Sequence, residues 1–258
     1  MVGAEGVGIE RAGTDGVDAE GVDTDSAADR LRRIHQRIAE ACERSGRTPH
    51  QVTLVGASKR QSAERLRAVR DAGLRVFGEN QVGEGEAHRD LLTPSAAGEA
   101  LEWHLIGPLQ SNKAKRAAQL FEVFHAVDRV KIGRVLDRHL SEANRRAIAF
   151  LEINLGNEES KHGFAPAAVA EAARSLADLE HLDIRGLMAI PPPEGSEDRA
   201  RQWFQQLVRL RDDLDRRPEW AGRLRHLSMG MSGDFELAVE EGATHIRVGT
   251  ALFGPRKS

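Results

Sequence analysis

The sequence predicts an α/β fold, a single (β/α)8 TIM barrel with an extra helix at its N-terminal side. Three observations support this class. From Gln51 onward, short apolar runs alternate with longer amphipathic ones, as they do in parallel βαβ units. Eight such units suit a closed barrel better than an open doubly wound sheet, and none of them is followed by the glycine signature of a Rossmann fold. At 258 residues the chain also has the length of one such barrel.

Composition narrows the class of function. The chain is 40% hydrophobic and 30% charged, with a net charge of −3, so basic and acidic residues nearly cancel. We therefore expect neither nucleic acid nor an anionic membrane as a partner. We find no apolar run of bilayer length and no signal-peptide pattern, and we expect a cytoplasmic protein. Cys42 is the only cysteine, so an internal disulfide is excluded, and the scattered histidines predict no metal site.

The N-terminal region contains two segments of different character, a leader and a helix. Residues 1–25 consist largely of Gly, Ala, Val, Asp and Glu, which offer too little bulky apolar surface to offset the entropy of ordering. We interpret them as a disordered acidic leader, with the barrel domain spanning 26–258. Ser26 and Asp29 then resemble a capping box, and apolar residues follow at helical spacing at Leu31, Ile34, Ile38 and Ala41. A helix over 26–44 is the result.

The remaining elements follow from hydrophobic period. The expected strands lie at 52–57, 75–78, 103–106, 122–126, 147–154, 184–190, 225–228 and 244–248. The expected helices between them lie at 62–72, 112–120, 130–144, 166–179, 203–214 and 233–241. The pattern is clearest in 203–214, where large apolar residues recur every three or four positions.

Lys59 is the first candidate for chemistry. It follows a continuous apolar, β-branched run, as expected for a strand buried on both faces, and a lysine at such a place is costly to bury without a task. The alternative is a surface lysine where the strand meets its loop. Because the active site of this fold lies at the C-terminal ends of the strands, the residues after the other strands decide between the two.

The segments after strands seven and eight predict a phosphate site. Barrels often bind phosphate there, at the N-terminus of a short extra helix, and residues 251–253 suit that helix. Ser228 and Thr250 supply hydroxyl groups, and Gly249 lets the backbone approach closely. A lysine at the same mouth points to a ligand with both a phosphate and an aldehyde, namely pyridoxal 5′-phosphate (PLP) held as a Schiff base. Arg247 then suits the pyridine nitrogen, where a cation weakens the ring as an electron sink.

Several segments, in this order, resemble the pyridoxal phosphate homeostasis proteins, single-domain barrels similar to the N-terminal domain of alanine racemase. The matching segments are 55–59, 77–80, 103–113, 154–163, 186–188, 226–235 and 243–254. The resemblance implies a Schiff base at Lys59, ring contacts from Asn80 and Met229, a pyridine-nitrogen contact from Arg247, and phosphate contacts from Ser228, Gly249 and Thr250. It implies a protein that buffers or delivers PLP, possible recipients being apo PLP-dependent enzymes, with no turnover reaction. Gln81 departs from the Tyr that is common in the family.

Two enzymes remain as alternatives. An amino-acid racemase needs an acid/base group on each face of the substrate, and this chain has no Tyr, so His104 or His226 would have to serve. A Schiff-base aldolase of phosphorylated sugars needs a carboxylate near the lysine, and Glu79 is the one expected within reach. Lys161, in the polar loop after strand five, is a weaker candidate for a secondary contact with the cofactor. A monomer is the expected state.

Overall fold

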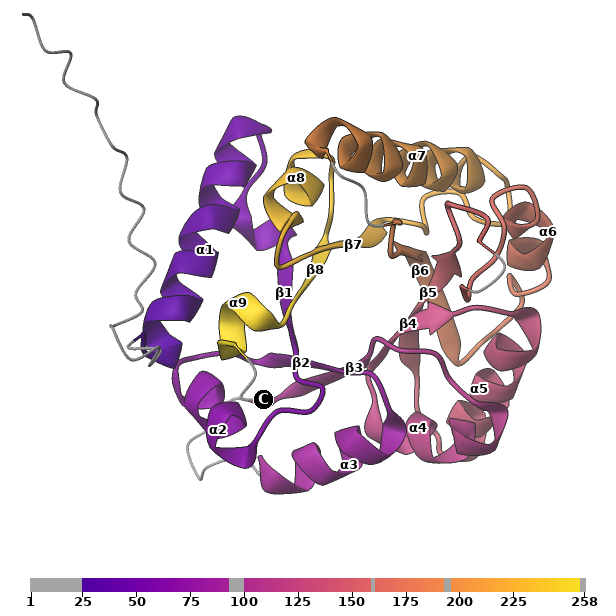
Figure 1. Cartoon of the computed structure of the whole chain (residues 1–258). Helices are drawn as coiled ribbons and strands as arrows, with labels where there is room; N and C mark the ends of the chain where they lie inside the picture. The colour runs from indigo at the N-terminus through magenta and orange to yellow at the C-terminus, as the bar shows by residue number, and fades with distance from the viewer. Residues whose placement is uncertain (1–24, 93–99, 159–160, 193–195, 256–258) are drawn as a thin grey trace, which may run out of the picture.

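The computed structural model describes residues 25–92, 100–158, 161–192 and 196–255, and it confirms the predicted fold (Figure 1). Eight parallel strands form a closed barrel in sequence order. The strands are β1 (Thr53–Ala57), β2 (Val76–Glu79), β3 (Glu102–Leu105), β4 (Val123–Val127), β5 (Ala147–Ile153), β6 (Leu182–Ala189), β7 (His226–Met231) and β8 (His245–Val248). All eight expected strands are present, with ends that differ by at most three residues. The expected leader lies outside the described residues except for Asp25.

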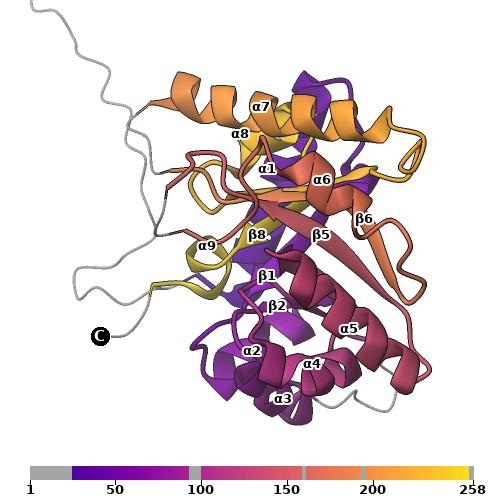
Figure 2. The same cartoon turned by 90° about the vertical axis from the view of Figure 1, so that its right-hand side faces the viewer.

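The helices surround the barrel, as Figure 1 shows in a view along it. They are α1 (Ala27–Arg44), α2 (Ala63–Asp71), α3 (Val82–Leu91), α4 (Ala114–Leu120), α5 (Val130–Glu142), α6 (Val169–Arg174), α7 (Glu197–Asp215), α8 (Phe235–Glu240) and α9 (Thr250–Phe253). Two short 3-10 turns, Pro49–Gln51 and Ser111–Lys113, precede β1 and α4. Among the described residues, no helix has the length and apolarity needed to cross a membrane. Figure 2 shows that α9 lies at one end of the barrel rather than on its side.

Helix α3 was not predicted, because its buried face lacks large apolar side chains. Val82, Gly85 and His88 form that face at a spacing of three residues. A Cβ atom at Gly85 would lie 2.5 Å from Phe121 Cζ. The absence of a side chain at Gly85 therefore lets α3 lie close to Phe121. Helix α6 is shorter than expected, at six residues, since turns replace helix on both sides of it.

The predicted N-terminal helix is confirmed as α1. Ser26 caps it by accepting a hydrogen bond from the Asp29 N–H, and Leu31, Ile34 and Ile38 are buried beneath it. Helix α1 contacts α8 and α9, which places it over the seam where β1 and β8 close the barrel.

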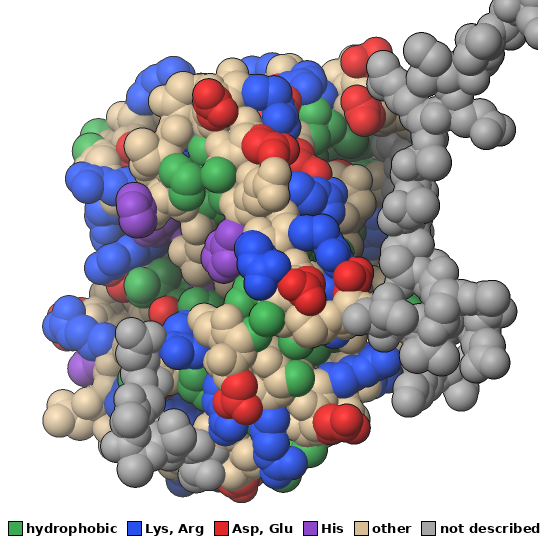
Figure 3. Space-filling view, turned by 90° about the vertical axis from the view of Figure 1, so that its left-hand side faces the viewer, with side chains coloured by type: hydrophobic (Ala, Val, Ile, Leu, Met, Phe, Trp, Pro, Cys, Tyr) green, Lys and Arg blue, Asp and Glu red, His purple; other side chains and the backbone are tan. Residues whose placement is uncertain are grey.

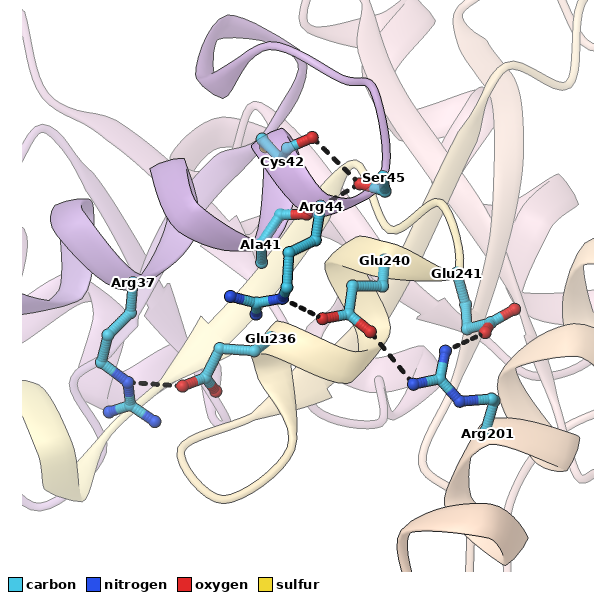
Figure 4. A network of polar contacts seen from close by, with 9 residues as sticks. All are labelled: Arg37, Ala41, Cys42, Arg44, Ser45, Arg201, Glu236, Glu240 and Glu241. Atoms are coloured by element: carbon cyan, nitrogen blue, oxygen red, sulfur yellow. Dashed lines mark hydrogen bonds and ion pairs between the residues drawn. The ribbon is translucent and has the colours of Figure 1, made fainter.

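Ion pairs on the outside of this contact join three helices (Figure 4). Arg37 of α1 pairs with Glu236 at 2.5 Å, and Arg44 pairs with Glu240 at 2.7 Å. Arg201 of α7 reaches Glu240 at 3.0 Å and Glu241 at 2.5 Å. Such partly exposed pairs each contribute less than about 1 kcal/mol, so the apolar face of α1 does most to hold it. On the side of the molecule that carries α1, basic and acidic side chains are interspersed (Figure 3).

The interior of the barrel is unusually polar. Large branched apolar residues usually fill this space in layers. Here, side chains of five polar residues are at most 9% exposed within it, around Phe150: His104, His125, Ser228, His245 and Arg247. The main apolar cluster lies instead between the outside of the sheet and the helices. This arrangement was not predicted from the sequence.

Candidate functional site

Lys59 lies directly after β1, at the C-terminal end of the barrel. Ser58 is fully buried, and its N–H donates to Gly78 O at 2.9 Å, which continues the pairing with β2 beyond the last strand residue. Its hydroxyl donates to Glu79 Oε1 at 2.5 Å, on the outer side of the sheet. Since neighbouring residues of an extended chain point to opposite faces, Lys59 is directed to the mouth. The side chain is half-buried, and the chain turns at Arg60, whose φ is 57°.

Glu79 is not available to Lys59 as an acid or base. Its side chain is fully buried, and Oε1 contacts both Ser58 Oγ and His88 Nδ1, the latter at 2.7 Å. The hydrogen bond to Glu79 raises the pKa of His88 in α3, against the effect of its burial. Glu79 therefore faces α3 on the outside of the barrel. The carboxylate that an aldolase would need lies on the other side of the sheet from the mouth.

Arg247 is a buried cation for which the described part of the chain supplies no ion-paired acidic partner. It is 5% exposed, and it donates from Nη1 to Ser228 Oγ at 2.5 Å and from Nη2 to Ala189 O at 3.0 Å. Burial lowers its pKa to about 10, opposed by the charges of Asp234 and Glu152. No carboxylate of the described residues lies within ion-pair distance of it. Burying a guanidinium without a counterion is costly, so its remaining N–H groups suit a hydrogen-bond acceptor on a ligand.

The segments after β7 and β8 meet as predicted, but a different serine lies between them. The N–H groups of Gly249 and Ala251 both point to Ser232 Oγ, at 3.2 and 3.5 Å. Two convergent N–H groups and a hydroxyl at the start of α9 form a place for a phosphate oxygen. Thr250, the first residue of α9, is exposed beside them.

Ser228 lies deeper than predicted. It is fully buried, and its hydroxyl contacts Arg247 Nη1 and His125 Nδ1, the latter at 2.7 Å. The pairing of β7 with β8 shifts register between Ser228 and Met231, so the two-residue period of the strand does not carry across this segment. The predicted phosphate contact of Ser228 is untested, and Ser232 is the serine that the structure places next to Gly249.

The two predicted ring contacts differ in their placement. Asn80 follows β2, is half-buried, and lines a cavity of about 530 Å³ together with Gln81, Lys113, Arg129 and His162. It is therefore at the mouth. Met229 is fully buried in the main apolar cluster, together with Leu227 and Phe235. Met231, two residues later, is 39% exposed and lines a larger groove between α1, α7 and α8.

Glu152 of β5 is a titratable group at this site that the sequence analysis missed. Its side chain is half-buried, and Oε2 has no hydrogen-bond partner among the described residues. Burial raises the pKa of Glu152 to about 7, and Asp128 adds to the rise, whereas His162 and Arg247 oppose it. The feature of the sequence that could have pointed to Glu152 is a carboxylate inside the apolar run Phe150–Ile153.

Lys161 lies in the loop after β5 and lines the larger groove, which has a volume of about 1090 Å³ and also contacts Met231 and Asp234. Its amine forms an ion pair with Glu158 at 2.6 Å. A secondary contact with the cofactor stays a prediction for this residue.

Comparison with known proteins places the whole barrel in one family. The family model described as the N-terminal domain of alanine racemase matches residues 22–257. A protein from Aquifex aeolicus, named pyridoxal phosphate homeostasis protein, is 41% identical over 236 residues, which cover 90% of this chain and 99% of that protein.

Solved structures show the same relation. PipY of Synechococcus elongatus with PLP bound is 38% identical, with a TM-score of 0.76, and the match covers 88% of this chain and 100% of PipY. Without PLP the corresponding values are 37% and 0.78. Alanine racemase of Clostridium difficile shares only the fold, at 16% identity and a TM-score of 0.67 over 58% of its length.

Proposed function

Since the chain belongs to the pyridoxal phosphate homeostasis proteins, within the family of the alanine racemase N-terminal domain, we propose that it binds PLP and buffers or delivers it in vitamin B6 homeostasis. The observation that carries this proposal is the match to PipY with PLP bound, at 38% identity over the full length of PipY. The residues at the mouth fit the same ligand, because a lysine, a buried cation without a counterion and two convergent N–H groups lie at the ends of neighbouring strands.

Lys59 is the attachment point in this proposal. Its uncharged amine condenses with the aldehyde of PLP, so that a carbon–nitrogen double bond forms and one water molecule leaves with the aldehyde oxygen and both amine protons. The N–H groups of Gly249 and Ala251, with the hydroxyls of Ser232 and Thr250, hold the phosphate. Asn80 borders the ring. PLP supplies an electron sink to any amine bound in this way.

Arg247 makes a turnover reaction unfavourable. A cation opposite the pyridine nitrogen disfavours protonation there, and an unprotonated ring withdraws electrons weakly. Neither of the two histidines considered for the second acid/base group of a racemase lies at the mouth. His104 is bonded to Glu102 and His125 inside the barrel, and His226 begins β7 at the end opposite to the mouth. We therefore infer a carrier rather than an enzyme, cytosolic and monomeric, with apo PLP-dependent enzymes as recipients.

The near-visible absorbance of the purified protein tests the proposal. Titration with PLP is expected to give a Schiff-base band in the wild type and none in Lys59→Ala, while Lys131→Ala, on the exposed side of α5, keeps the band. Addition of L-alanine or D-alanine is expected to give no inversion of either enantiomer. Absence of the band in the wild type would refute PLP binding, and inversion would show that the protein is a racemase.

A further inference from the structure

A continuous chain of hydrogen bonds crosses the interior of the barrel and ends at Arg247. Arg247 Nη1 contacts Ser228 Oγ at 2.5 Å, and Ser228 Oγ contacts His125 Nδ1 at 2.7 Å. His125 Nε2 contacts His104 Nδ1 at 2.9 Å, and His104 Nε2 contacts Glu102 Oε1 at 3.0 Å. Glu102 begins β3, so the chain runs from the mouth to the opposite rim.

Both ends of this chain fix the same direction of donation. A guanidinium only donates, so Ser228 accepts from Arg247 and has its own O–H left to give to His125 Nδ1. A carboxylate only accepts, so His104 donates from Nε2 to Glu102 and takes the hydrogen bond from His125 at Nδ1. His125 therefore accepts at Nδ1 and donates from Nε2. Every group of the chain then has its hydrogen-bond partner, and every shared proton points away from Arg247.

The surroundings keep the chain in this state. Burial lowers the pKa of His125 well below its usual value, and the charge of Arg247 lowers it further. Ser228 and His125 are fully buried and His104 is 1% exposed, so water has little access to the middle of the chain. Only the carboxylate of Glu102 reaches solvent, with 47% of its side chain exposed.

We propose that Ser228 and His125 are positioning residues for Arg247: the chain fixes the rotation of the guanidinium, so that its unused N–H groups face the ring nitrogen of PLP. This inference rests on the proposed function. A serine hydroxyl alone rotates freely, and one that is free to turn holds a long arginine side chain poorly. Here the hydroxyl has a single orientation, because it donates a hydrogen bond to His125 Nδ1. The ring of His125 is in turn held by its hydrogen bond to His104.

His245 provides a matched control. Its ring lies in the same interior layer, with a centroid 5.7 Å from that of His125, and it is also buried, at 9% exposed. Its Nδ1 contacts Thr244 Oγ1 at 2.9 Å, so it takes no part in the chain to Arg247. His125→Leu and His245→Leu thus remove the same ring from the same space, and only the first interrupts the chain.

The test is PLP binding by the full-length variants, measured as the dissociation constant and as the wavelength of the near-visible band over a range of pH. Ser228→Ala and His125→Leu are expected to bind PLP roughly tenfold more weakly, since a hydrogen bond to a charged group is lost, and to shift the band. His245→Leu is expected to keep the wild-type band. His125→Gln, whose amide again offers one acceptor and one donor, is expected to recover most of the affinity.

The outcomes separate this inference from the proposed function. If the wild type binds PLP and Ser228→Ala matches it in affinity and band position, the chain does not position Arg247, although the protein still binds PLP. Equal losses in His125→Leu and His245→Leu would also overturn the inference, because they would show a general effect of interior packing. Should His125→Leu fail to fold, Ser228→Ala, which removes one oxygen atom, decides by itself.

Discussion

Replacing Glu152 by Gln is expected to make the protein more stable, by an amount that grows between pH 4.5 and about pH 7 and is constant above that range. Burial raises the pKa of this carboxyl from its ordinary 4.5 to about 7. Between these two values the folded protein keeps a proton that the unfolded chain releases, so stability falls as pH rises through this window and the loss is complete above pH 7. One pKa unit corresponds to about 1.4 kcal/mol, and the side chain keeps some contact with solvent, so the loss is about 2 to 3 kcal/mol.

The assay is urea denaturation of the apo protein at a series of pH values from 4.5 to 8.5. Glu152→Gln has nearly the shape of the protonated acid, so the free energies of unfolding of the two proteins should agree at the acidic end. At pH 8 the variant should be more stable by about 2 to 3 kcal/mol. Glu180→Gln, at an exposed position before β6, controls for the loss of one negative charge. A difference that does not change with pH, or a wild type that is the more stable at pH 8, would refute the reasoning.

Two further substitutions test the fold and the mouth. Gly85→Ala should lower the free energy of unfolding by about 1 to 3 kcal/mol, because its Cβ would lie 2.5 Å from Phe121 Cζ. Gly83→Ala in the same helix is the control, since its Cβ meets nothing within 4 Å and the change should be neutral or stabilising. Thermal unfolding compares the two variants, and equal effects would contradict the packing of α3. Ser232→Ala should weaken PLP binding about threefold to tenfold, through loss of a phosphate contact, while leaving the melting temperature of the apo protein unchanged. Fluorescence titration measures the affinity, and an unchanged value would return the phosphate contact to Ser228.

The repeating hydrophobic pattern was enough to predict the eight strands and the closed barrel, because each strand is a short, nearly continuous apolar run. Helix α3 escaped this reasoning, since a glycine and a histidine occupy its buried face. The rule that barrels bind ligands at the C-terminal ends of their strands was enough to expect Lys59, Asn80 and Gly249 at one end of the barrel, where the structure has them. Their contacts with PLP stay predictions, as does the phosphate contact of Ser228. The rule did not point to Ser232, because the register shift after Ser228 breaks the two-residue period.

The polar interior could not be predicted either, and the reason is physical. Each of these polar residues lies in a strand whose other residues are mostly apolar. A single polar residue in such a run is more often a tolerated exception than part of a network. What joins them is closure of the barrel: Val55 pairs with Arg247, and Ser228 contacts a histidine that is 103 residues away along the chain. Contacts of that length leave no pattern in one sequence.

The hydroxyl at position 228 and the distance of the nearest charge in the chain explain how a cation can stay buried and still be free for a ligand. A carboxylate at position 228 would stabilise Arg247 more strongly than a hydroxyl does, but it would form a bidentate pair and occupy the N–H groups that the ligand needs. Ser228 engages Nη1 only, and the negative charge of Glu102 stands at the far rim, three hydrogen bonds beyond Ser228. This combination suits a protein that holds PLP without converting amines, because the guanidinium can then meet the ring nitrogen as a cation without protonating it. Ser228→Asp therefore makes the sharpest contrast with Ser228→Ala: it should stabilise the apo protein against urea and still weaken PLP binding, and tighter PLP binding by Ser228→Asp would show that Arg247 does not face the ring nitrogen.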